Sequence, residues 1–520
     1  MKSTYCATIL LTIALSIGLC PIGVTLAADS SLIKLYVDES RSLQLGKQVW
    51  KGLNRKDGFF QTRVMASPSF DLLKQYDVMI IWNQIETFSY SRSELEAIRK
   101  YVETGGGLLL LGDPLIPRYA ANLRPRKVLF KDAQPLPFND FSMNQIADMF
   151  GVQFSNGNVM GIPSFAKKDP VITNIDTTLL SFNQSLSPLL CTNRGIKTLV
   201  YANRKPVAVS LSYGKGRVGI CAARGLFMKY GRLFDRKLGK TDHIISVQKE
   251  LLVNWLQWLA ENSPARQISP SGYPDSVIPE IRLSGNNAEV YCIPPLRTVA
   301  KDLLAKWELV WDDFSKYTGL SSPLEFIPVA KPGDKLQVYL RAATAGGLAA
   351  GTRISVPGAG TESTMISVLG HEVGHKLLGG WSMPISEAFA EWFAMRALRA
   401  TGYREMAENK MKTSYAYFTK ADPSHKTVDI SVNPTDINLS RAIGAKWTWI
   451  MTQLCEKYGD DIISKYIASL HRNNKMLNPY KKHDGNKLVP LTFKDHVTAL
   501  CEATGEDLTP WFRNLGTTIE

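Results

Sequence analysis

The sequence predicts an α/β protein with two domains, the second of which ends in a helical part. Strand patterns alternate with helix patterns from residue 31 to about residue 261, which indicates a parallel sheet covered by helices. A stretch rich in proline and serine follows, and the second half carries His371-Glu372-Val373-Gly374-His375 within a helical pattern. At 520 residues the chain is also too long for one ordinary core.

The first element is predicted to be a secretory signal peptide over residues 1–27. Lys2 supplies its positive charge, an apolar run covers residues 9–24, and small residues precede a cleavage point before Ala28. The alternative is an uncleaved membrane anchor, which the glycine and proline within the run disfavour. Cys20 is a weak lipoprotein candidate. No later stretch is long and apolar enough to span a bilayer, so we expect a secreted or periplasmic protein without a transmembrane segment in the mature chain.

The first domain, residues 28–262, is predicted to contain the parallel sheet. Ser91 is placed to cap one of its helices, and Gly105, Gly106 and Gly107 end that helix. These glycines follow a helix and precede a strand, whereas a phosphate-binding loop needs the opposite order, so we expect a turn. We expect strands at residues 32–37, 59–65, 76–82 and 108–111, and helices at residues 45–53, 92–104 and 247–260.

The second domain, residues 281–520, follows a linker predicted at residues 263–280. Residues 346–357 are expected to form a flexible turn that runs into a strand. Further strands are expected at residues 281–283, 288–291, 324–329 and 336–340, and helices at residues 296–317, 361–378, 384–392, 445–458 and 460–471.

Charge and cysteine content narrow the class of protein. The formal net charge is +14, and the basic residues are spread along the chain without a nucleic-acid-binding module. A generally basic exported surface explains this charge, and the sharper alternative is attraction to anionic glycans or acidic glycoproteins. The cysteines left after the leader are few, scattered and odd in number, which excludes a disulfide-built scaffold. They are Cys191, Cys221, Cys292, Cys455 and Cys501, of which the last two are candidates for a pair that spacing alone does not decide.

The pentapeptide at 371–375 predicts a zinc site. Its two histidines lie on one helical face, one turn apart, and the intervening Glu372 then points at the water of the site. A catalytic site needs a third protein ligand, for which Glu387 on the next helix is the simplest assignment. Glu391 would then accept the free N–H of a zinc-bound histidine. The reverse assignment of these carboxylates stays open, because positions i and i+4 face the same way.

This set of residues indicates zinc-dependent hydrolysis. Zinc lowers the pKa of its water and polarises the scissile carbonyl. Glu372 is expected to take the proton from that water and pass it to the leaving amine. The oxyanion needs a further donor, for which Tyr415, Tyr417 and His425 are the downstream candidates.

The second half resembles the enhancin-like, mucin-degrading family of zinc metallopeptidases within the gluzincin clan. The resemblance covers roughly residues 285–520 and depends on the pentapeptide, the eleven-residue gap before Glu387, and Lys446-Trp447-Thr448-Trp449-Ile450. It implies an α+β zincin domain and an endopeptidase acting on mucin-type O-glycosylated proteins. In zincin folds a strand such as the one at 346–357 forms the edge with which a peptide substrate pairs.

The first half resembles the class I glutamine-amidotransferase-like domain, which is a flavodoxin-like sandwich. The resemblance depends on residues 77–82, 98–109 and 213–218. Active members carry a nucleophilic cysteine on a sharp strand-to-helix turn, whereas this chain has Gly112-Asp113-Pro114 at that place. We therefore expect this domain to be non-catalytic.

Together these observations predict an exported zinc-dependent endopeptidase that acts on glycosylated, mucin-like proteins. One alternative is a glycoprotein-binding protein that uses a zincin scaffold without cleaving. Another is a zinc aminopeptidase, although no Gly-x-Met-Glu-Asn motif precedes the metal-binding helix.

Overall fold

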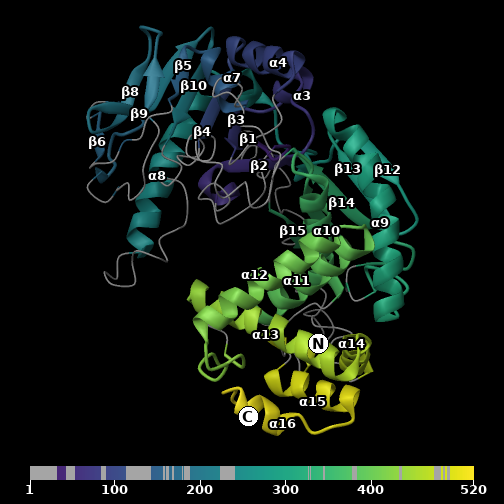
Figure 1. The fold of residues 1–520 in the computed structure, drawn as a ribbon. Helices are drawn as coiled ribbons and strands as arrows, with labels where there is room; N and C mark the ends of the chain where they lie inside the picture. Colours follow the sequence, from purple (N-terminus) through teal and green to yellow (C-terminus); the bar gives the residue numbers. More distant parts are fainter. Residues whose placement is uncertain are drawn as a thin grey trace, which may run out of the picture.

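The protein is described here by a computed structural model (Figure 1). The residues it describes are 32–41, 53–83, 90–112, 142–155, 159, 163–166, 169–177, 180, 188–222, 241–325, 327, 330–342, 346–377, 383–432, 436–472, 482–483, 487–488 and 492–519. The predicted signal peptide and the predicted helix at residues 45–53 lie almost wholly outside these residues.

A nine-stranded mixed sheet organises the first half. Its central strands are parallel to one another, and its last three pairings are antiparallel. The order is β11 (Ser276–Val277), β2 (Phe59–Val64), β1 (Ile33–Asp38), β3 (Val78–Asn83), β4 (Gly107–Gly112), β10 (Gly216–Cys221), β9 (Lys205–Tyr213), β8 (Lys197–Ala202) and β6 (Pro163–Phe165). A separate pair joins β5 (Val152–Phe154) to β7 (Leu189–Cys191).

Helices cover both faces of the central strands, as the alternating pattern predicts. On one face Trp255 and its neighbours on α8 (Thr241–Ala260) pack against alternate residues of β1, β3 and β4. On the other face lie α3 (Phe70–Leu73), α4 (Arg92–Glu103) and α7 (Ser142–Asp148). The apolar residues of β3 and β4 are buried on both sides of the sheet, which explains why these two strands have continuous apolar runs in sequence.

The glycine run at 105–107 turns the chain from α4 into β4, as predicted. Ser91 caps α4 through a reciprocal capping box with Glu94, and the helix ends at Glu103. Gly105 has a φ of +122°, which disfavours other residues. A Cβ on Gly107 would lie 2.6 Å from the carbonyl oxygen of Leu259, so this glycine allows β4 to approach the end of α8 closely.

The segment predicted as a linker returns to the first sheet. A 3₁₀ helix, η7 (Pro264–Gln267), places the carbonyls of Ala265 and Ile268 at 2.6 and 2.8 Å from Nζ of the buried Lys34. Asp77 supplies the counter-charge at 3.1 Å. β11 then pairs in parallel with β2. The chain therefore leaves the first half from an edge strand rather than from a free tether.

The second half contains a five-stranded sheet. Its order is β12 (Ile281–Ser284), β13 (Ala288–Cys292), β14 (Leu336–Arg341), β16 (Arg353–Pro357) and β15 (Leu348–Ala350). The 3₁₀ helix η8 (Pro294–Leu296) leads into α9 (Arg297–Thr318), which packs on β12 and β13, while α10 (Glu362–Leu377) packs on β15 and β16. The strand predicted at 324–329 is absent from the described residues of that segment, where residues 323–325 form a turn.

Helices form the rest of the second half, which confirms the predicted helical C-terminal part (Figure 1). They share one large apolar core with α9 and α10. They are α11 (Met383–Ala400), α12 (Arg404–Ala421), α13 (Ile437–Tyr458), α14 (Ile462–Arg472), α15 (Phe493–Thr504) and α16 (Thr509–Asn514), with a short hairpin of β17 (Lys482–His483) and β18 (Lys487–Leu488). None of the helices in the described part of the chain combines the length and apolar character that a bilayer crossing requires.

The two halves meet at an ion-pair cluster around the buried Glu39. Arg341, at the end of β14, donates to the carbonyl oxygen of Glu39 at 2.6 Å and lies 3.8 Å from its carboxylate. Arg63 on β2 holds the same carboxylate at 2.9 Å. Cys455 and Cys501 are both free thiols, so the two candidates for a disulfide do not form one.

Candidate metal centre

Two closely packed helices carry the centre. Gly370 and Gly374 face α11, and a Cβ on Gly374 would lie 2.8 Å from the Cα of Ala390. Because these glycines lack side chains, the backbones of α10 and α11 can approach each other closely. This approach places the histidines of α10 opposite the carboxylates of α11.

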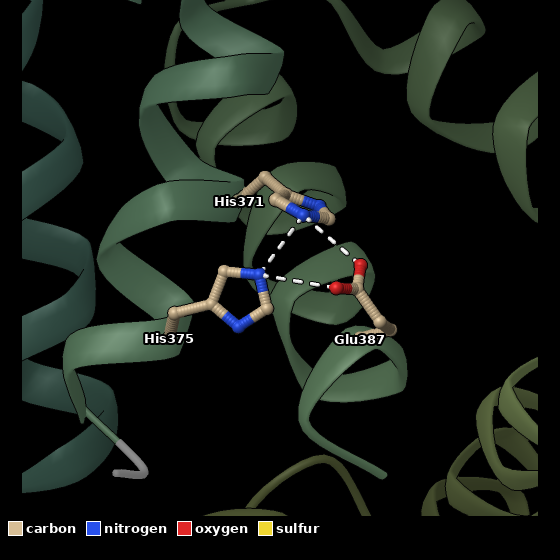
Figure 2. Close-up of side chains that lie close together, drawn as sticks. All are labelled: His371, His375 and Glu387. Atoms are coloured by element: carbon tan, nitrogen blue, oxygen red, sulfur yellow. Dashed lines mark hydrogen bonds and ion pairs between the residues drawn. The ribbon is translucent and has the colours of Figure 1, made fainter. Parts of the chain in front are cut away.

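Three side chains converge on one point (Figure 2). Nε2 of His371 lies 3.1 Å from Nε2 of His375. The carboxylate of Glu387 lies 3.4 Å from the first of these nitrogens and 3.7 Å from the second. Both imidazoles are mostly buried, whereas the Glu387 side chain is 43% exposed, so the site is open on the side of the carboxylate.

These separations fit a small divalent metal ion. Tetrahedral zinc with bonds of about 2.1 Å to nitrogen and oxygen separates its ligand atoms by about 3.4 Å. The observed distances of 3.1, 3.4 and 3.7 Å are centred on that value. Two imidazoles and one carboxylate are also a donor set that zinc prefers, and three ligands leave a fourth position open.

The Nδ1 atom of each histidine, which faces away from the metal position, contacts a side chain of α11. Nδ1 of His371 lies 3.1 Å from the carboxylate of Glu391, and Nδ1 of His375 lies 2.8 Å from Oγ of Ser386. Such contacts fix the rings so that both Nε2 atoms face the metal position. Glu387 thus approaches the metal-facing nitrogens and Glu391 the outer one, which is the arrangement that the simpler sequence assignment expects.

Lys410 on α12 forms an ion pair with Glu391. Burial alone would raise the pKa of Glu391, but its contacts with His371 and Lys410 lower it. Glu391 therefore stays ionised and accepts a hydrogen bond from His371. In the metal-free protein, burial would lower the pKa of His371, but contacts with Glu387 and Glu391 raise it. A metal ion entering the site must displace that proton.

Glu372 stands beside the triad rather than within it. It is 6% exposed, and in the metal-free protein burial, together with the charge of Glu387, raises its pKa to about 7. A carboxylate with a pKa near neutrality can both accept and return a proton at physiological pH. Its Oε1 lies so close to Gly347 that a Cβ there would be 2.2 Å away. The proposed base therefore lies directly against the start of β15.

The edge strand β15 borders the centre. It pairs only with β16 among the described strands, and its Leu348 and Ala350 are exposed. Lys376, one turn beyond Glu372 on α10, donates to the carbonyl oxygen of Gly351 at 2.5 Å. Burial lowers the pKa of Lys376 to about 8, although the nearby Glu372 opposes this shift.

Two of the three candidate oxyanion donors lie on α12, and the third lies in the loop that follows it. Tyr415 on α12 is exposed and lines a cavity of about 310 Å³ together with Trp449. Tyr417 is exposed, and its hydroxyl lies 3.4 Å from the carbonyl oxygen of Asn438. His425 stacks edge-on against Trp449 with ring centroids 4.7 Å apart. The role of each as a donor stays a prediction.

Sequence reasoning missed Ser386, Lys376 and Lys410. Ser386 precedes Glu387, and Lys376 follows His375, so both were adjacent to residues already singled out. A buried lysine on the same face as Glu372 was detectable from the i, i+4 spacing. Lys410 had no such signal, because its contact depends on how α12 lies against α11.

No protein-family model and no curated protein matches this sequence. Among solved structures, a cytoplasmic protein of Salmonella typhimurium matches at 17% identity and a TM-score of 0.30, over 44% of this chain and 99% of that one. A protein of Bacteroides uniformis described as ThuA-like matches at 14% identity and a TM-score of 0.28, over 45% of this chain and 93% of that one. Yeast LTA4 hydrolase in complex with bestatin matches at 15% identity and a TM-score of 0.31, over 46% of this chain and 39% of that one. At these identities and TM-scores, the matches do not indicate a function.

Proposed function

We propose that this protein is a zinc-dependent endopeptidase, with the catalytic centre on α10 and α11. The observation that carries the proposal is the convergence of His371, His375 and Glu387 at metal-ligand separations, with Glu372 beside them. We further propose that the second half is a gluzincin-type zincin domain, and that the first half is a flavodoxin-like domain without catalytic activity.

The chemistry follows from the parts present. Zinc bound by the triad would supply a Lewis acid that activates water and polarises the scissile carbonyl. Glu372 is placed to accept the proton of the attacking water and return it to the leaving amine, because it follows His371 directly on α10 and its side chain lies against Gly347 beside the site. Glu391 and Ser386 hold the imidazole rings in place throughout.

The edge strand favours an extended peptide as the substrate. An unpaired strand edge offers backbone N–H and C=O groups that an extended chain can join as an added strand. Because Gly347 lies against Glu372, a peptide pairing with β15 would pass next to the base. This placement supports cleavage within a chain.

The substrate class and location are further parts of the proposal. The resemblance to mucin-degrading enzymes favours glycosylated, mucin-like proteins, and the net charge of +14 favours substrates with anionic glycans. The leader at residues 1–27 favours a secreted or periplasmic location.

A paired metal and cleavage assay tests the proposal. Wild type and Glu372→Ala are purified, their zinc content is measured, and each is incubated with a glycosylated mucin. We expect both to bind one zinc ion and only the wild type to cleave. Glu408→Ala, at an exposed position on α12, is the matched control and should cleave normally.

Other outcomes would replace the proposal. Zinc binding without cleavage by the wild type would favour a glycoprotein-binding protein. Cleavage that requires a free α-amino group, measured with acetylated peptides, would favour an aminopeptidase. Absence of zinc from the wild type after metal loading would remove the proposal altogether.

A further inference from the structure

Lys376 is a buried cation that the proposed chemistry does not use. Its residue is 4% exposed, and its ammonium donates to one backbone carbonyl, that of Gly351, at 2.5 Å. Burying an ammonium costs free energy unless it is paired and hydrogen-bonded. Because the Lys376 ammonium is buried despite that cost, its hydrogen bond to Gly351 indicates a role in fixing the position of Gly351.

Gly351 lies in the turn that joins β15 to β16. The two strands pair antiparallel, from Leu348 opposite Ser355 to Ala350 opposite Arg353. The turn carries Gly351 at a φ of +49°, a left-handed conformation that glycine adopts readily. The Lys376 contact therefore fixes the far end of a short edge strand to the helix that carries the metal ligands.

The near end of β15 rests on the same helix. A Cβ on Gly347 would lie 2.6 Å from a methyl carbon of Val368 and 2.2 Å from Oε1 of Glu372. Val368, Glu372 and Lys376 are spaced four residues apart and form one stripe along α10. This stripe meets β15 at both ends, with the proposed base at one end and the lysine at the other.

We propose that Lys376 is a positioning residue that fixes the edge strand β15 over Glu372. The contact would set where along the strand a bound peptide meets the base. This inference rests on the proposed function, because it concerns the placement of a peptide substrate. Lys376 itself touches neither the metal position nor the reacting atoms, and it acts through the strand.

Substrate length separates this role from general stability. In Lys376→Met, we expect kcat/KM to fall on the order of tenfold for peptides long enough to pair with β15, mainly through a higher KM. Peptides too short to pair should lose clearly less, since they do not use the strand and share only the effect of the lost charge near Glu372. Zinc content should stay at the wild-type level, and Lys376→Arg, which keeps the charge and donors, should restore part of the loss.

Lys335 provides a matched control. Its ammonium donates to the carbonyl oxygen of Gly285 at 2.7 Å, in the turn between β12 and β13 at the opposite edge of the same sheet. Lys335→Met removes a lysine-to-turn contact of the same kind far from β15 in strand order. We expect it to leave the length dependence of kcat/KM unchanged.

Hydrogen exchange provides a readout that does not need activity. In zinc-loaded Lys376→Met, amides of residues 348–356 should exchange faster than in the wild type, whereas Lys335→Met should leave them unchanged. If the wild type cleaves nothing, the proposed function fails, while hydrogen exchange still tests whether the Lys376–Gly351 contact fixes β15. Unchanged exchange in the segment, or an equal loss for short and long peptides, would overturn the inference. Should Lys376→Met not fold, Lys376→Gln is used for the same measurements. The glutamine side chain is one bond shorter than that of lysine, so its N–H group does not reach the carbonyl oxygen of Gly351.

Discussion

Two carboxylates on one helical face have different positions at the metal centre. Glu387 approaches the metal-facing nitrogens of both histidines, whereas Glu391 contacts the outer nitrogen of His371 and the ammonium of Lys410. Spacing alone left their roles interchangeable, because both residues face the same way from α11. Only the side-chain positions distinguish the carboxylate that faces both Nε2 atoms from the one that contacts the outer nitrogen of His371.

Replacing each carboxylate in turn tests these roles. Glu391→Ala should weaken zinc binding about 10- to 100-fold, because His371 loses the partner that orients its ring. Glu387→Ala should weaken it further, because a ligand itself is lost. Competition with a chelator of known affinity measures both. A larger loss for Glu391→Ala than for Glu387→Ala would exchange the two assignments.

A buried histidine on α15, His496, makes stability depend on pH. Burial lowers the pKa of His496 to about 4, and Nδ1 lies 2.7 Å from the Tyr466 hydroxyl. The unfolded chain, with a histidine pKa near 6.5, binds the proton first as the pH falls. The folded state therefore loses stability from about pH 6.5 down to pH 4, with a loss of about 2 kcal/mol between pH 7 and pH 5.

His496→Asn should remove that part of the pH dependence, because its amide oxygen can accept from Tyr466 without titrating. Urea unfolding of both proteins at pH 7 and pH 5 measures the difference. The difference in the free energy of unfolding between pH 7 and pH 5 should be smaller by about 2 kcal/mol in the variant. An unchanged difference would mean that other groups cause the dependence.

Helix periodicity was the most informative pattern at the scale of elements. The ends of α4, α9 and α10 lie within one residue of the predicted positions, because caps, glycines and apolar spacing all act locally. The predicted strand at 324–329 was wrong in its described part, since a short apolar run does not distinguish a strand from a packed turn. Its Leu324 is buried in the core without belonging to a sheet.

The close packing of α10 on α11 gives a prediction at this scale. Gly374→Ala should lower the free energy of unfolding by roughly 1–3 kcal/mol, because the new methyl group meets the backbone of α11. This loss should appear although alanine favours a helix by about 1 kcal/mol over glycine. Zinc affinity should fall with it, because the two helices carry the ligands.

Denaturant unfolding and chelator competition measure both effects. Glu408→Ala on the exposed side of α12 is the control, with an expected change within about 0.5 kcal/mol. A Gly374→Ala protein as stable as the wild type would show that the helices can separate at little cost.

At the scale of the whole molecule, one glutamate joins the halves. Glu39 at the end of β1 accepts from Arg341 and Arg63, and Arg341 also lies 3.4 Å from Oγ of Ser355 on β16. This path leads from the first sheet to the strand that supports β15. The contact therefore connects the first half to the strand next to the edge beside the candidate metal centre.

Arg341→Met should therefore lower the free energy of unfolding by roughly 3 kcal/mol, because Glu39 remains buried with one partner fewer. Arg282→Met removes an arginine from the same sheet, but that side chain is 62% exposed in its pair with Glu289. It should cost less than about 1 kcal/mol. Equal losses in the two variants, measured by urea unfolding, would contradict a special role for the junction.

Sequence patterns predicted the two halves better than the contacts between them. The alternation of strands and helices and the pentapeptide were local features, and mixed α/β sheets and a helical end follow from them. The pairing of β11 with β2 depends on residues more than two hundred positions apart, and proline-rich composition gave no sign of it. The Glu39–Arg341 contact is non-local in the same way.

The return of the chain to the first sheet decides where the molecule can be divided for separate expression. A fragment that ends at residue 262 would lack β11 and leave the edge of β2 open to pairing with other copies. It would also deprive the ammonium of Lys34 of two of its three oxygen partners. A fragment of residues 28–278 keeps both features. The structural boundary of the first half therefore lies well beyond residue 262, where the sequence pattern places it.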